Sequence, residues 1–207
     1  DTLYLHGDTI FTVTDETGRR ITARRNVRFY RHDLQGLCDT LVYADADSVI
    51  HMHHLPVLWS GNDQITGNNI RIALKDRKAH RLYVEGNAFL VSEADSIHWD
   101  QVTGLTMTGH FADNELRSLV ADGNTRTVYF AREQAADGTE RIIGVNRADC
   151  SRIVVGMREG NISTVSFLER PDAVLYPLEK APPDELRMKG AELRSAERPM
   201  DRSAIFN

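Results

Sequence analysis

The chain has 207 residues, of which 41% are hydrophobic and 27% are charged, a composition typical of a folded domain rather than a disordered one. Its formal net charge of −5 provides no basic field that would hold DNA or RNA, so no nucleic-acid partner is expected. No apolar run in the sequence approaches the ~20 residues that a membrane-spanning helix needs.

Short segments rich in β-branched and aromatic residues follow one another along the chain, separated by Gly, Asp, Asn and Ser. This pattern predicts an all-β protein. The expected strands contain Arg28-Phe29-Tyr30, Leu41-Val42-Tyr43, Val57-Leu58-Trp59, Ile70-Arg71-Ile72-Ala73-Leu74, Phe89-Leu90-Val91, Val128-Tyr129-Phe130 and Val165-Ser166-Phe167. The expected turn centres are Thr17-Gly18, Ser60-Gly61, Asp122-Gly123, Asp137-Gly138 and Glu159-Gly160.

An internal repeat of about three strands recurs every ~30–45 residues. Each copy opens with a small residue and continues with alternating apolar residues. The copies begin at Gly7, Gly36, Gly67, Gly104 and Ala148, and the matched apolar pairs are Leu41/Tyr43, Ile72/Leu74 and Ile153/Val155. Because no copy can bury its apolar face alone, the copies are expected to stack into an elongated sheet with a continuous apolar seam.

The repeat also bears on the two cysteines. Cys38 and Cys150 occupy the same position in the second and fifth copies, which are three repeat steps apart. Even one strand spacing of ~4.8 Å per step exceeds the ~7 Å limit for bridging two Cα atoms. The sequence therefore predicts two free thiols.

The last segment of the chain has a different character. Residues 182–189, Pro-Pro-Asp-Glu-Leu-Arg-Met-Lys, predict a short helix with proline at its start and acidic residues in its first turn. We therefore expect residues 1–180 to form the β-repeat domain and residues 181–207 to form a short helix and a polar tail. The chain begins at Asp1 without a methionine, which is compatible with a removed leader or with a trimmed chain.

A histidine cluster, His51-Met52-His53-His54, is the most visible candidate for metal binding. On a strand, His51 and His53 would point to the same face, as two ligands of a zinc or copper ion do. A stable site usually needs three or four ligands, and no third ligand stands nearby in the sequence. A solvent-facing strand end is therefore favoured, and no metal or other cofactor is expected.

Two pairs of carboxylates recur before similar segments, Asp45/Asp47 and Glu93/Asp95. Paired carboxylates serve glycosidases and calcium sites, but a feature that recurs between strands is more simply a turn with Asx-type hydrogen bonds. Asp8, Asp39 and Asp149 recur beside the opening residues of the copies, which favours a shared structural position over catalysis. No nucleophile elbow, P-loop or dinucleotide fingerprint is present, so no enzyme is predicted.

Several segments in order resemble the OstA-like (LptA-like) family of Gram-negative bacteria. They are residues 27–43, Pro56-Val57-Leu58-Trp59, residues 64–70, residues 84–89, Met107-Thr108-Gly109-His110-Phe111 and residues 170–177. The resemblance covers the chain from about Leu3 to Pro199. It implies an open, twisted β-jellyroll of stacked antiparallel strands that acts in the periplasm, without catalysis or cofactor, in lipopolysaccharide transport to the outer membrane.

The family's apolar groove gives the alternating residues a possible role. Acyl chains of lipopolysaccharide or lipid A would lie against the inward-facing side chains, and each buried CH₂ contributes about 0.8 kcal/mol. The expected groove residues are Leu41, Tyr43, Ile70, Ile72, Leu74, Phe111, Ile153 and Val155, with Arg71, Arg81 and Arg152 as candidates for a basic rim. For each apolar residue, the alternative is a packed core without ligand.

Open strand edges imply partners. Pairing of such edges would join this chain to other lipopolysaccharide-transport proteins, or to further copies of itself in a head-to-tail oligomer. Two other functions stay open at this point. One is a carbohydrate-binding or carbohydrate-active β-repeat domain, and the other is a structural assembly module that binds no lipid.

Overall fold

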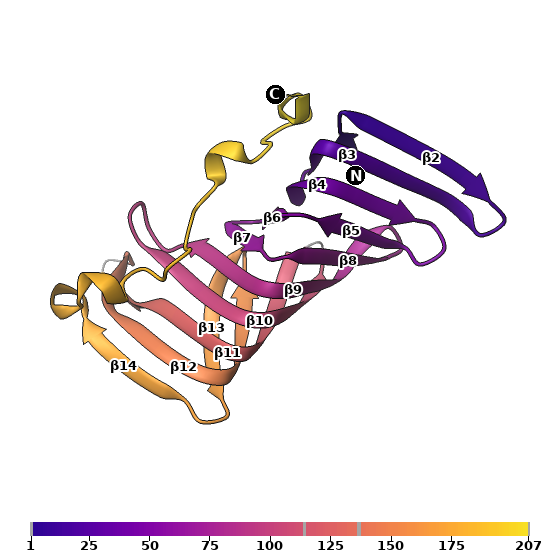
Figure 1. The fold of residues 1–207 in the computed structure, drawn as a ribbon. Coiled ribbons are helices and arrows are strands. Elements are labelled where there is room, and N and C mark those ends of the chain that lie inside the picture. Colours follow the sequence, from indigo (N-terminus) through magenta and orange to yellow (C-terminus); the bar gives the residue numbers. More distant parts are fainter. Residues whose placement is uncertain (1, 114, 136–137, 207) are drawn as a thin grey trace.

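The computed structural model describes residues 2–113, 115–135 and 138–206 (Figure 1). Within these residues the chain forms one 14-stranded antiparallel sheet, which confirms the predicted all-β jellyroll class. The strands are β1 Tyr4–His6, β2 Thr9–Asp15, β3 Gly18–Arg31, β4 Leu34–Ala44, β5 Val49–His53, β6 Val57–Ser60, β7 Asp63–Thr66, β8 Asn69–Lys75, β9 Lys78–Glu93, β10 Trp99–Ala112, β11 Glu115–Gln134, β12 Glu140–Arg158, β13 Asn161–Leu168 and β14 Asp172–Pro177.

The sheet is divided lengthwise into two halves that share six long strands, β3, β4, β9, β10, β11 and β12. The first half-sheet runs in the order β2-β3-β4-β5-β8-β9-β10-β11-β12-β13. The second half-sheet runs in the order β1-β3-β4-β6-β7-β9-β10-β11-β12-β14. Each long strand therefore passes from one half to the other at a corner, and we call the row of these corners the corner line.

Register shifts mark the corner line, because an extra residue in one strand bends it and increases its twist. In β9 the corner contains Gly86 and Asn87 with φ of +69° and +51°, and in β11 it contains Gly123 and Asn124 with φ of +82° and +49°. Glycine and asparagine tolerate this left-handed conformation better than other residues. The expected turn at Asp122-Gly123 is thus a corner inside β11, whereas the turns at Thr17-Gly18, Ser60-Gly61 and Glu159-Gly160 join strands as predicted. Asp137 lies outside the described residues.

One apolar core fills the space between the two half-sheets. Directly paired residues in neighbouring strands share a face, so the strand register orders the core of the first half-sheet into two ladders. The first ladder contains Ile21, Tyr43, Ile50, Ile72, Leu82, Gly109, Leu119, Val155 and Val165. The second ladder contains Ile10, Ala23, Leu41, Met52, Ile70, Val84, Met107, Ala121, Ile153 and Phe167.

The ladders correct the alignment of the repeats. The sequence matched Ile72 and Leu74 with Leu41 and Tyr43, but the register places Ile70 beside Leu41's ladder and Ile72 beside Tyr43's. The alignment was wrong by two residues. Because the side-chain period of a strand is also two, the slip leaves every one of these residues on the predicted face.

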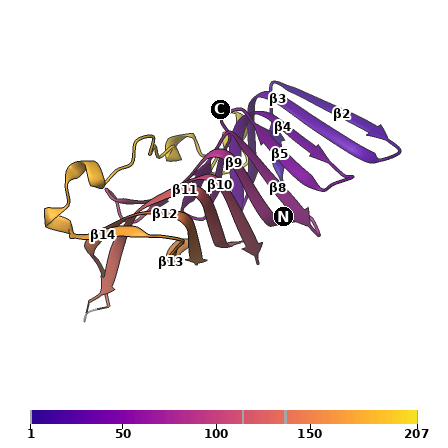
Figure 2. The same cartoon turned by 60° about the horizontal axis from the view of Figure 1, so that its bottom comes forward.

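The residues after β14 form a strap, residues 178–206, that crosses the outer face of the second half-sheet from β14 to β1 and β3 (Figures 1 and 2). It contains only 3-10 turns, η1 Leu178–Lys180, η2 Pro183–Glu185, η3 Ser195–Glu197 and η4 Ala204–Phe206. The helix expected over residues 182–189 is therefore a single turn, η2, with proline and acidic residues where they were predicted. None of the helical turns among the described residues is long and apolar enough to cross a membrane.

Buried glutamines hold the strap. Gln35, Gln64 and Gln101 project from β4, β7 and β10 and are 3%, 2% and 1% exposed. Gln101 donates from Nε2 to the Leu186 carbonyl at 3.0 Å and accepts from the Met188 N–H at 2.8 Å. Gln64 treats Glu192 and Arg194 in the same way, at 2.7 and 2.6 Å. Each amide thus replaces a peptide group of a neighbouring strand and satisfies the strap backbone where no strand could.

Both cysteines are free thiols. Cys38 lies on β4 and is buried, and Cys150 lies on β12 and is half-buried. Burial raises the pKa of the Cys38 thiol to about 12. This thiol therefore stays protonated at neutral pH and behaves as a small apolar side chain of the core.

Candidate functional site

The structure brings all eight predicted groove residues into the single core between the half-sheets. They come from β4, β8, β10 and β12. Leu41, Ile70, Ile72, Phe111, Ile153 and Val155 are buried, while Tyr43 and Leu74 are partly buried and pack against the others. They contact one another and their neighbours in the ladders, so in this structure they form the floor of a filled core.

The half-sheets meet again opposite the corner line, where the turn between β6 and β7 touches the turn between β12 and β13. A Cβ added to Gly61 would lie 3.0 Å from the Gly160 Cα, so the two turns are in direct contact. Asn62 Nδ2 also donates to Asn161 Oδ1 at 3.0 Å. These exposed contacts between turns are weaker than the paired strands at the corner line, so separation of the half-sheets would begin here.

A cavity of about 370 Å³ lies beside these turns and is mostly acidic. Its lining includes Asp33, Asp63, Asp113, Glu115 and Glu159, together with His32 and Arg198. Asp63 is 1% exposed, and its Oδ1 has no hydrogen-bond partner among the described residues. Burial raises the pKa of Asp63 to about 7, and Asp100 adds to the rise, while Ser92 and Arg198 oppose it.

The three arginines nominated for a basic rim do not face the core. Arg71, Arg81 and Arg152 each neighbour a core residue in sequence, and alternation along a strand places them on the outer face. Arg71 pairs with Glu85, and Arg152 pairs with Asp122. The expectation of a basic rim was therefore wrong, because it did not take the alternation of faces into account.

The strands at both ends of the stack have an edge without a partner among the residues described. These strands are β2 and β1 at one end and β13 and β14 at the other. They expose apolar side chains: Ile10 on β2 is 47% exposed, and Leu175 on β14 is 63% exposed. An exposed edge with apolar side chains is a template for pairing with another strand.

The histidine cluster lies on the outer face of the first half-sheet. The rings of His51 and His53 are stacked with centroids 6.1 Å apart, and His53 Nδ1 lies 2.8 Å from Asn69 Oδ1. His54 sits at the corner line with φ of +60°. In the described part of the chain, no group of three or more His, Cys, Asp or Glu side chains is placed to hold a metal ion.

The recurring carboxylates form turns, as the sequence favoured. Asp47 Oδ1 accepts from the Val49 N–H at 3.0 Å, and Asp95 Oδ1 accepts from the N–H groups of Ile97 and His98 at 2.8 and 2.7 Å. These are Asx-type hydrogen bonds, which fix the backbone two residues ahead.

The aspartates at the openings of the copies lie at the corner line. Asp8 donates from its backbone N–H to the Arg25 carbonyl, and Asp39 donates from its own to the His54 carbonyl. The side chain of Asp149 pairs with Arg126. All three therefore hold structural contacts at the bend of the sheet, which confirms the shared position predicted for them.

Comparison with known proteins relates the chain to others through its fold. No family model and no curated protein matches the sequence. Among solved structures, the chain is similar to LptH of Pseudomonas aeruginosa, described as the LptA-homologous periplasmic component of the conserved lipopolysaccharide transport device. The match has a TM-score of 0.51 at 16% identity and covers 70% of this chain and 95% of LptH. The likeness shows the fold: the chain is built as a β-jellyroll similar to that of LptH.

Proposed function

We propose that the chain is a periplasmic bridge module that carries lipopolysaccharide toward the outer membrane, with the acyl chains held between the two half-sheets. The observation that supports this most is the pair of apolar ladders, which run without a charged residue through all ten strands of the first half-sheet. Such a seam offers acyl chains the same environment from end to end. The likeness in fold to LptH supports the same proposal.

The filled core makes entry of the lipid a question of energy. The ladder side chains pack against one another, so acyl chains would enter by separating the half-sheets at the touching turns, Gly61 and Gly160. Each CH₂ transferred from water contributes about 0.8 kcal/mol. Several acyl chains together would offset the lost contacts between the half-sheets, while the strand hydrogen bonds and the corner line stay intact.

Photo-crosslinking tests the path of the lipid. A benzophenone amino acid at Tyr43 or Phe167, both half-buried in the ladders, is expected to crosslink to lipid A. The same amino acid at Val42 or Ser166, the outward neighbours on the same strands, is expected not to. Crosslinks read by mass spectrometry at the outward positions, or at neither, would contradict the proposed path.

The second candidate is an assembly module that binds no lipid. The tight core favours it, because Ile70, Ile72 and Ile153 are fully buried. Under this proposal the crosslinking positions all stay silent while the edges still pair.

The open edges predict association between copies or with related modules. Replacement of Ile10 on β2 by lysine is expected to shift the chain from linear oligomers to monomers, because a charge on an edge strand opposes pairing. Ile97→Lys is the matched control, since Ile97 is also exposed, at 76%, but lies in the loop between β9 and β10. Analytical ultracentrifugation over a concentration series measures the change. A wild-type chain that stays monomeric throughout would remove self-association from the proposal.

A further inference from the structure

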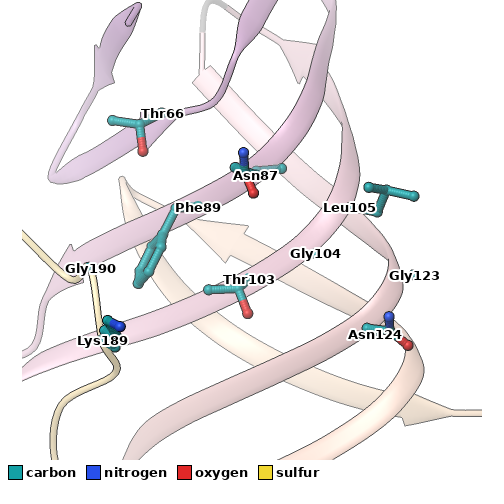
Figure 3. Close-up of a pocket in the computed structure, with 11 residues that line it drawn as sticks. Thr66, Asn87, Phe89, Thr103, Gly104, Leu105, Gly123, Asn124, Lys189 and Gly190 are labelled. Carbon is teal, nitrogen blue, oxygen red and sulfur yellow. The ribbon is translucent and has the colours of Figure 1, made fainter.

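A continuous groove runs along the outer side of the corner line, between the second half-sheet and the strap. A cavity of about 520 Å³ forms its centre (Figure 3). This cavity shares Thr66, Asn87 and Gly190 with a neighbour of about 320 Å³, and shares Thr103 and Asn124 with another of about 400 Å³. We call the three together the corner groove. The central cavity alone falls within the usual size range of ligand pockets.

The floor of the corner groove is a row of paired residues. Thr66 on β7 pairs with Phe89 on β9, and Phe89 pairs with Thr103 on β10. One residue per strand gives a spacing of about 4.8 Å, so a half-exposed ring lies between two hydroxyl groups. Figure 3 shows Phe89 between Thr103 and the part of the strap that carries Lys189.

The corners themselves supply amide groups above this floor. Asn87 and Asn124 occupy the left-handed corner positions of β9 and β11 and line the central cavity. The bends that fold the sheet therefore also present side-chain amides at regular intervals along the groove.

Several hydrogen-bonding groups in the corner groove have no partner in the protein. Among the described residues, the side chains of Thr66, Thr103, Asn124 and Lys189 make no hydrogen bond or ion pair. The other charges near the groove are already paired, Arg126 with Asp149 and Arg194 with Glu197. The groove thus offers hydroxyls, an amide and one uncompensated positive charge around an aromatic ring.

This lining fits a sugar chain better than a lipid. Hydroxyl and amide groups match the many hydroxyls of a saccharide, and an aromatic face packs against the apolar face of a sugar ring. The strand spacing along the floor is close to the length of one pyranose unit. An ammonium group with no protein carboxylate beside it favours a ligand with an acidic group.

We propose that the corner groove binds an oligosaccharide that carries acidic groups. The Phe89 ring lies under one sugar, Thr66 and Thr103 bond its neighbours, and Lys189 pairs with a carboxylate or phosphate of the ligand. The site is independent of the lipid-binding proposal, because the groove lies outside the core and shares none of the eight core residues.

Titration with tetragalacturonate, followed by amide resonances in ¹H–¹⁵N NMR spectra, tests the proposal. The resonances of Thr66, Phe89, Thr103 and Asn124 are expected to shift together and to saturate. Thr103→Val keeps the shape and strand preference of the side chain but removes the hydroxyl, and it is expected to weaken binding roughly three- to tenfold. Thr108→Val, on the same strand but in the first half-sheet, is the matched control and is expected to bind as the wild type does.

The charge is tested separately with a neutral ligand of the same length, chitotetraose. Lys189→Gln is expected to weaken tetragalacturonate binding and to leave chitotetraose binding unchanged. Equal weakening of both ligands would overturn the ion pair assigned to Lys189. Saturable shifts that map away from the groove, or no shift with either ligand at millimolar concentration, would overturn the site, while the crosslinking of lipid A at Tyr43 would be unaffected by either result.

Discussion

Gln101→Ala is expected to release the strap and to lower the free energy of unfolding by about 2–4 kcal/mol. The Gln101 amide satisfies two backbone groups of the strap, the Leu186 carbonyl and the Met188 N–H. Without it both groups are left unpaired, Met188 in a buried position, and each unpaired buried group costs roughly 1–3 kcal/mol. The strap would then open locally before the sheet unfolds.

Chemical denaturation measures the loss, and limited trypsin digestion locates it. Cleavage after Arg187 and Lys189 is expected to become faster in the variant than in the wild type. Gln134→Ala, at the exposed end of β11, is the control and is expected to change neither measurement. If the two variants behaved alike, the strap would not depend on its glutamine contacts.

Asp63→Asn is expected to stabilise the protein at pH 8 and to remove much of its pH dependence between pH 4 and 8. The pKa of Asp63 is raised to about 7 from an ordinary 3.8, chiefly by burial. The folded state therefore favours the protonated carboxyl, so its contribution to stability is fully present below about pH 4 and is lost as pH rises to about 7. Since one pKa unit corresponds to about 1.4 kcal/mol, the ionised side chain costs up to about 4 kcal/mol at pH 8.

Thermal or chemical denaturation at several pH values measures this effect as the difference between variant and wild type. His32 lines the same cavity and titrates in the same range, but its contribution is common to both proteins and cancels in the difference. Asp113→Asn is the control, because Asp113 lines the cavity with an exposed side chain. A variant that is no more stable than the wild type at pH 8 would show that the Asp63 carboxylate is compensated in the folded protein.

Both predictions bear on the proposed bridge. Asp63 and the strap residue Arg198 line the cavity where the half-sheets touch, and Arg198 also bonds the Gly61 carbonyl at 2.8 Å. The charge on Asp63 therefore acts at the place where the half-sheets would separate to admit acyl chains. A lower pH, which neutralises Asp63, is expected to hold this end of the structure closed.

Much of the core could be predicted because its information is local. Alternation with a period of two assigns Leu41, Tyr43, Ile70 and Ile72 to one face of their strands, whichever strands lie beside them. The same periodicity survives the alignment error of two residues, so the face was correct although the partners were not. The Asx turns at Asp47 and Asp95 were predictable for the same reason, since each hydrogen bond closes within two residues.

The corner line was only half visible in the sequence. Asp122-Gly123 carries the residues of a turn, and the left-handed conformation it implies is present. Whether the chain reverses there or continues into the second half-sheet depends on which strands are available to pair on each side. That choice is made by the neighbouring strands β10 and β12, not by the residues of the corner.

The sequence by itself determined the all-β class, the strand faces, the repeat and the apolar seam, because each follows from residues close together in the chain. The tertiary structure alone decided the register, the glutamine contacts of the strap and the corner groove. Gln101 lies 87 residues from Met188, and the groove joins Thr66, Thr103 and Lys189 from three separate segments. Contacts over such separations leave no periodic signal, since they arise only when strand pairing and chain reversal have placed distant residues side by side.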